Sequence, residues 1–328
     1  MQAVTALRPA PAGSPPMASG PATLVAALAG AAVALVATTA LLATDVGLYA
    51  VDGAALGSGL ASAGLALFFV LPGAAEVRPV LRRVLQVLVT TAFAATALTV
   101  PFEIMAVDAR GLTGLGDAVA RDLVLRSDDF EAVLVRCVGL AAVALGVRVV
   151  GRRRLTLLPA ICGAVIVAGS FVFTGHARTN GPGAVVVACA LAHVLAAAAW
   201  FGGLVGLTLA LRRVSGPRAG ELLATFASLM TGIVTMLFAG GLGLAFLYLP
   251  SPDALLTTAY GQVLLVKLAV IGGLAVLAAA NHRRLVPLAA KGGARELRVL
   301  RMNVTVEQIG LLAVVFITEV LMRQNPGG

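Results

Sequence analysis

The chain has 328 residues, of which 59% are hydrophobic and only 12% are charged, and its mean hydropathy is +0.99. A soluble domain carries about 25% charged residues, so this composition excludes an ordinary soluble protein. Apolar runs of about 20 residues, the length of a helical span, recur along the chain, which excludes the alternating strands of an outer-membrane barrel. We therefore expect an all-α, polytopic bundle of transmembrane helices in the plasma (inner) membrane, surrounded by lipid.

The net charge of +9 does not indicate a nucleic-acid-binding protein. The basic residues lie in short clusters between apolar runs and not on one soluble surface. Membrane topology explains this charge, and we expect no nucleic acid among the partners.

In chain order, residues 1–21 contain five prolines among Ala, Gly and Ser, a composition that predicts a disordered tail. Residues 22–130 are expected to form the first membrane spans and an acidic outer loop, and residues 131–328 a second membrane domain. Nine spans are predicted, at about 22–44, 54–72, 82–106, 131–150, 155–174, 184–211, 221–248, 259–280 and 302–322.

The distribution of basic residues predicts the orientation of these spans. Of the 24 Lys and Arg residues, 17 fall in the segments on one side of the predicted membrane and five on the other. Because Lys and Arg concentrate in cytoplasmic loops, the amino terminus is expected in the cytoplasm and the carboxyl terminus outside. The outer loop at about 107–130 is rich in Asp, so an acidic outer surface is expected to attract cations or simply to be solvated.

Two of the three histidines are the main candidates for a site. His176 follows the predicted fifth span, and His193 lies about 13 Å along the sixth, so both are expected to face one outward-open cavity. Cys189 and Trp200 share a helical face with His193. An imidazole within the bilayer is a functional-site candidate, and imidazole and thiolate ligands suit copper better than magnesium or calcium. A structural hydrogen bond of His193 is the alternative.

Further polar side chains lie in the same spans. Glu103 and Met105 end the third span and are candidates to complete the copper site, although Met is more often a packing residue. Charges within or near spans need partners, and they comprise Arg136, Lys267, Glu307 and Glu319. Lys267 and Glu319 are expected at similar depth and form a predicted pair, while Glu307 is expected to pair with a basic residue at the inner mouth. Bundle-fixing ion pairs and a transport or proton-relay role both remain open.

Residues 174–322 resemble the copper resistance protein D (CopD) family of membrane proteins. The likeness rests on Thr174-Gly175-His176-Ala177, on His193 with Trp200-Phe201-Gly202-Gly203, on Phe226-x-Ser228, on Tyr260-Gly261-x2-Leu264-Leu265-x-Lys267-Leu268 running to Asn281, and on Glu307 in the last helix. The resemblance implies a membrane protein that handles copper, in uptake or tolerance, with His176 and His193 as metal positions. It also describes residues 131–328 as a CopD-like domain.

The leading hypothesis is the movement of copper ions across the membrane, with a soluble extracytoplasmic copper chaperone as an expected partner. The chain contains no P-loop, which argues against ATP-driven pumping, and we expect no enzymatic activity. One alternative is a haem-binding electron-transfer protein, since paired histidines on neighbouring helices ligate haem iron. The other is an accessory factor that delivers copper to oxidase assembly.

Overall fold

The computed structural model describes residues 44–108, 111–148, 157–174, 183–214 and 217–324. Within these ranges the chain forms helices and turns and no strand. The α-helices are α2 (Thr44–Phe69), α3 (Arg78–Asp108), α4 (Ala118–Leu125), α5 (Asp128–Arg148), α6 (Leu158–Ser170), α8 (Ala184–Leu211), α9 (Pro217–Tyr248), α10 (Ala254–Thr257), α11 (Ala259–Ala280), α12 (Val286–Ala290) and α13 (Ala294–Met322). Three 3-10 helices and a π-helical turn complete the fold, namely η1 (Pro72–Val77), η2 (Gly111–Gly116), η4 (Phe171–Phe173) and η5 (Asn281–Leu285).

Seven of the described helical segments are long and apolar enough to cross a membrane. An eighth apolar segment, Leu158–Phe173, is shorter. The prediction of an all-helical membrane protein is confirmed, and each predicted span from 54–72 onward corresponds to one of these eight segments. The predicted tail at 1–21 and nearly all of the predicted first span lie outside the described residues.

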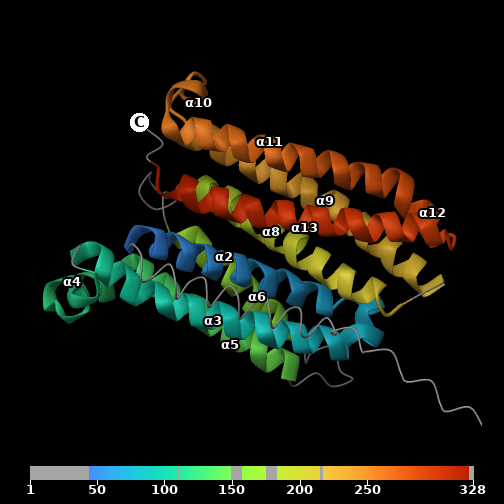
Figure 1. The fold of residues 1–328 in the computed structure, drawn as a ribbon, viewed down its shortest axis with the longest axis horizontal. Helices are drawn as coiled ribbons and strands as arrows, with labels where there is room; N and C mark the ends of the chain where they lie inside the picture. The colour runs from blue at the N-terminus through green and yellow to red at the C-terminus, as the bar shows by residue number, and fades with distance from the viewer. Residues whose placement is uncertain (1–43, 109–110, 149–156, 175–182, 215–216, 325–328) are drawn as a thin grey trace, which may run out of the picture.

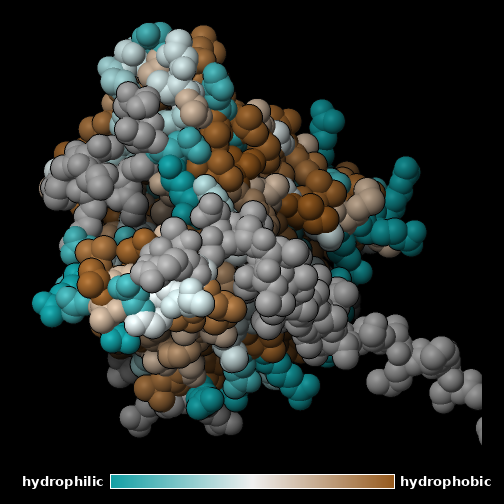
Figure 2. Space-filling view, turned by 60° about the vertical axis from the view of Figure 1, so that its left-hand side comes forward, coloured by the Kyte–Doolittle hydropathy of each residue, from teal (hydrophilic) through white to brown (hydrophobic). Residues whose placement is uncertain are grey.

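The long helices run side by side along the bundle, with α4 and α10 at one end and α12 at the other (Figure 1). The clusters of Arg and Lys that begin α3, end α8 and follow α11 lie at the α12 end, because the helices alternate in direction. This separation agrees with the charge count, and the orientation in the membrane stays a prediction. Below, the α4 end is called the outer end. Hydrophobic side chains form large patches on the face drawn in Figure 2, as expected for helices in contact with lipid.

Helix α2 is central, since it packs against α3, α6, α8 and α13. Its contact with α8 is close enough to exclude side chains at several positions: a Cβ atom on Gly202 would lie 2.3 Å from the Leu65 amide nitrogen, and one on Gly206 would lie 2.4 Å from the Phe68 ring. Gly202 and Gly206 are four residues apart, and small residues at this spacing allow a neighbouring helix to approach closely.

Local sequence signals explain how the outer end is built. Asp117 caps α4, because its carboxylate accepts hydrogen bonds from the amides of Val119 and Ala120. Acidic residues occupy the first turn of α5, where the positive end of the helix dipole favours them. Thr258 caps α11 through the amide of Gly261. These caps fix the starts of helices that line the cavities described below.

Candidate functional site

His193 lies on the side of α8 that faces α9. Its Nδ1 atom is 2.9 Å from the main-chain oxygen of Leu237. A carbonyl only accepts hydrogen bonds, so Nδ1 carries the proton and Nε2 keeps its lone pair. In a metal-binding histidine, the ring nitrogen that does not bind the metal usually donates a hydrogen bond to a group such as a backbone carbonyl. His176 lies outside the described residues, so its predicted convergence with His193 stays a prediction.

Three glycines of α9 create the room for this face of α8. A Cβ atom on Gly240 would lie 2.8 Å from the Cys189 carbonyl oxygen, and one on Gly241 would lie 3.0 Å from two atoms of the His193 ring. On Gly243, a Cβ atom would lie 2.7 Å from Cys189 Sγ. The three positions form a glycine cradle, defined here as Gly240, Gly241 and Gly243, against which Cys189 and His193 pack.

Two cavities meet His193. The larger, of about 720 Å³, lies among α8, α9, α11 and α13 and also contains Lys267 and Tyr248; we call it the lateral cavity. The smaller, of about 110 Å³, is bounded by His193, Lys267 and Trp200. His193 and Trp200 thus border the same small cavity, and Cys189 shares the glycine cradle with His193 but lines neither cavity.

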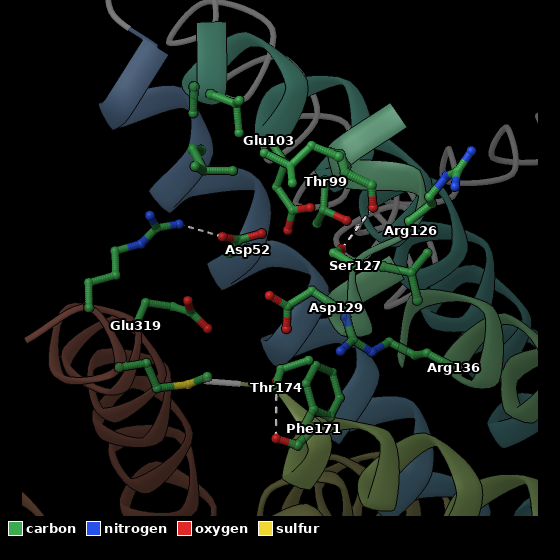
Figure 3. A pocket seen from close by; sticks show the side chains of 18 of the residues that line it. Asp52, Thr99, Glu103, Arg126, Ser127, Asp129, Arg136, Phe171, Thr174 and Glu319 are labelled. Carbon is green, nitrogen blue, oxygen red and sulfur yellow. Dashed lines mark hydrogen bonds and ion pairs between the residues drawn. The ribbon is translucent and has the colours of Figure 1, made fainter. Parts of the chain in front are cut away.

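A third cavity, of about 640 Å³, opens at the outer end of the bundle and is rich in carboxylates (Figure 3). We call it the acidic cavity. Its acidic residues are Asp52 of α2, Glu103 of α3, Asp122 of α4, Asp129 of α5 and Glu319 of α13. Figure 3 shows Asp52, Glu103, Asp129 and Glu319 directed toward the same space. Carboxylates from five helices thus gather at the outer end of the bundle, where their negative charge favours cations.

Arginines offset part of this negative charge. Arg323 forms an ion pair with Asp52, with 2.5 Å between Nη2 and Oδ2. Arg136 is buried in α5, where its Nε donates to Ser170 Oγ at 3.1 Å and its guanidinium carbon lies 3.8 Å from the centre of the Phe171 ring. Arg136 also lines the acidic cavity. The carboxylates of that cavity therefore supply the opposite charges that a buried arginine needs.

The structure places the remaining predicted residues apart from each other. Met105 is buried against Leu48, Val51 and Phe102 and lines none of the three cavities, which agrees with a packing role. Glu319 faces the acidic cavity and Lys267 the lateral cavity. These two described side chains form no ion pair, but their opposite charges attract each other across the boundary of the two cavities.

Glu307 is held by amides and not by a basic residue. Asn281 Nδ2 donates to Glu307 Oε1 at 2.6 Å, and Asn303 Nδ2 donates to Asn281 Oδ1 at 2.7 Å. The Trp200 side chain makes a further hydrogen bond to Glu307. The expected pairing with a basic residue is therefore replaced by a chain of neutral donors that fixes α8, η5 and α13 together.

Sequence reasoning missed several of these residues. The predicted span at 54–72 begins after Asp52, but α2 begins at Thr44 and brings Asp52 into the acidic cavity on a membrane helix. The apolar residues between 46 and 51 were the available signal for the longer helix. The Leu237 carbonyl and the glycine cradle had no such signal, because they act through contacts between helices. The described residues form no group of three or more His, Cys, Asp and Glu side chains close enough to hold one metal ion.

Comparison with known proteins bears on the carboxy-terminal part of the chain. Residues 220–321 match the family model of copper resistance protein D, or CopD. The predicted CopD relationship is confirmed over this region. The matched CopD segment contains the glycine cradle, Lys267, Glu307 and Glu319, whereas His193 and most of the acidic cavity precede it. No curated protein and no solved structure matches the chain. The apolar helices identify a multi-pass membrane protein, and its residues 220–321 are similar to CopD.

Proposed function

We propose that this protein carries copper ions across the plasma membrane as a transporter without enzymatic activity. Copper is collected in the acidic cavity, passes His193 in the bundle, and leaves at the α12 end. The CopD match supports copper as the ion. The hydrogen bond of His193 Nδ1 to the Leu237 carbonyl leaves Nε2 available. This supports His193 as a ligand, because imidazole suits copper well.

The observation that carries the proposal is that the acidic cavity and the lateral cavity adjoin. Phe171, Thr174 and Met322 line both of them. Met322 supplies a thioether, a soft ligand for Cu(I), at this boundary. A cation attracted by the carboxylates therefore meets sulfur and then imidazole within one continuous region. An ion can contact Met322 first and His193 next. Transport needs only such transient contacts and no permanent coordination site with a full set of ligands.

The acidic cavity has a separate role from the ligands. Its carboxylates raise the local concentration of cations, and this effect is screened by salt. The ion pair between Arg323 and Asp52 offsets the charge of Asp52, so Glu103 and Glu319 are expected to contribute a large part of the attraction. Removing those charges should raise the copper concentration needed for half-maximal transport, and removing His193 should lower the maximal rate.

The test is copper transport by the purified full-length chain in proteoliposomes, with copper added on either side and vesicle copper measured by mass spectrometry. His193→Ala is expected to abolish protein-dependent copper movement, whereas Cys162→Ala, at an exposed position of α6 that lines none of the three cavities, should retain it. Membrane insertion of both variants is checked by sedimentation of the vesicles. Equal transport by His193→Ala and the unchanged protein contradicts the proposal, and a Soret band in the purified protein would favour the haem alternative.

A further inference from the structure

The lateral cavity has the position of a site that takes its ligand from the bilayer. Helix α9 packs mainly on α8 and α12, and α11 packs on α13, so the cavity lies where α9 and α11 separate. Its wall includes Phe238, Leu242 and Leu268, which are 40%, 60% and 45% exposed on the outside of the bundle. These apolar side chains form a path from the surrounding hydrocarbon to the interior of the cavity.

One strongly polar group lies deep in this apolar space. Lys267 is eight residues from the start of α11, which places it about 12 Å along the helix. The hydrocarbon core is about 30 Å thick, so this amine lies well inside it. Glu319 attracts the Lys267 amine electrostatically, but within the described part of the chain no carboxylate forms an ion pair or hydrogen bond with it. A buried amine at this depth favours a ligand that accepts hydrogen bonds.

The depth of Lys267 in the membrane determines which lipid-soluble molecules can reach its amine. Phosphate and carboxylate heads of lipids remain at the interface, because taking a charge into hydrocarbon is costly. A neutral head group with carbonyl oxygens can reach Lys267 with a much smaller loss of solvation free energy. The volume of about 720 Å³ falls within the usual range for small-molecule sites. His193 Nε2, which borders the same cavity, can accept a hydrogen bond from a hydroxyl of the reduced form.

We propose that the lateral cavity binds a lipid-soluble quinone, with a ring carbonyl accepting a hydrogen bond from Lys267 and the tail leaving between α9 and α11. This binding site occupies the lateral cavity that the proposed copper path also crosses, at Met322 and His193. It requires no copper, so the two proposals can fail independently.

The chain supplies its own optical reporter for this site. Trp200 is its single tryptophan, and it borders the small cavity that also contains His193 and Lys267. Decylubiquinone is titrated into the full-length protein in nanodiscs of saturated phospholipid, with EDTA present, and Trp200 fluorescence is recorded. Saturable quenching is expected. Lys267→Met should weaken binding about tenfold or more, the loss of one charge-assisted hydrogen bond.

Matched variants keep the test decisive. Lys291→Met removes the only other lysine, which is exposed near α12, and should leave binding unchanged. Ala245→Phe places a ring in the lateral cavity while leaving Lys267 unsubstituted, and it should remove saturable quenching even if Lys267→Met does not fold. Equal affinity of Lys267→Met and the unchanged protein, or quenching that rises without saturation in every variant, overturns the proposal. Displacement of the quinone by equimolar oleate would also overturn it, in favour of an acidic ligand.

Discussion

Replacement of Gly240 by alanine tests whether the glycine cradle holds α8 and α9 together at His193. The new Cβ atom would lie 2.8 Å from the Cys189 carbonyl oxygen and 3.0 Å from the His193 amide nitrogen. Both neighbours are backbone atoms, so the two helices must separate locally. Overpacking of this kind costs about 1–3 kcal/mol.

A second glycine of α9 provides the control for the intrinsic effect of alanine. A Cβ atom on Gly232 meets nothing within 4 Å, so Gly232→Ala should gain only the helix propensity of about 1 kcal/mol. Gly240→Ala gains the same amount and also bears the overpacking cost. The free energy of unfolding of Gly240→Ala should therefore be about 1–3 kcal/mol lower than that of Gly232→Ala.

The assay is reversible unfolding of the purified variants in mixed micelles with increasing SDS, followed by circular dichroism. Copper transport of the same samples shows whether the separation of α8 and α9 also disturbs His193. The reasoning is refuted if Gly240→Ala is as stable as Gly232→Ala, because the α8–α9 contact would then not be as close as described.

Two further predictions use the same unfolding assay. Asn281→Leu removes a donor from buried Glu307 and should lower the free energy of unfolding by about 1–3 kcal/mol, and an unchanged stability would show that the amide chain is dispensable. The effects of Lys267→Met and Glu319→Gln should be non-additive by about 0.5 kcal/mol or more in the double variant, since the two opposite charges attract each other; additive effects would argue against the pairing expected from the sequence.

The contrast between α8 and Asp52 shows what sequence patterns can predict here. The predicted span at 184–211 coincides with α8, because a long uninterrupted apolar run has one interpretation. The span at 54–72 was predicted too short, because Asp52 was treated as a loop residue. A carboxylate can lie inside a membrane helix when neighbouring helices supply Arg323 and a polar cavity, and such partners are distant in sequence.

The candidate site was predicted only in part for a related reason. His193, Lys267 and Glu319 were recognised because ionisable residues are rare in apolar helices. Helices α8 and α11 are apolar on nearly all sides, so their patterns do not reveal which face meets protein and which meets lipid. The assignment of Glu319 and Lys267 to separate cavities, and of Gly241 to the His193 ring, depends on packing alone.

The contacts at the carboxy-terminal end of α13 limit how the chain can be divided for protein engineering. Arg323 forms its ion pair with Asp52 and lies 4.3 Å from the centre of the Tyr49 ring, so the end of α13 is fastened to α2. Both partners belong to the part of the chain that precedes the CopD match. A fragment of residues 220–321 expressed alone would lack this ion pair and the contact of α9 with α8. The CopD-like segment is therefore expected to depend on the preceding helices for its folding stability.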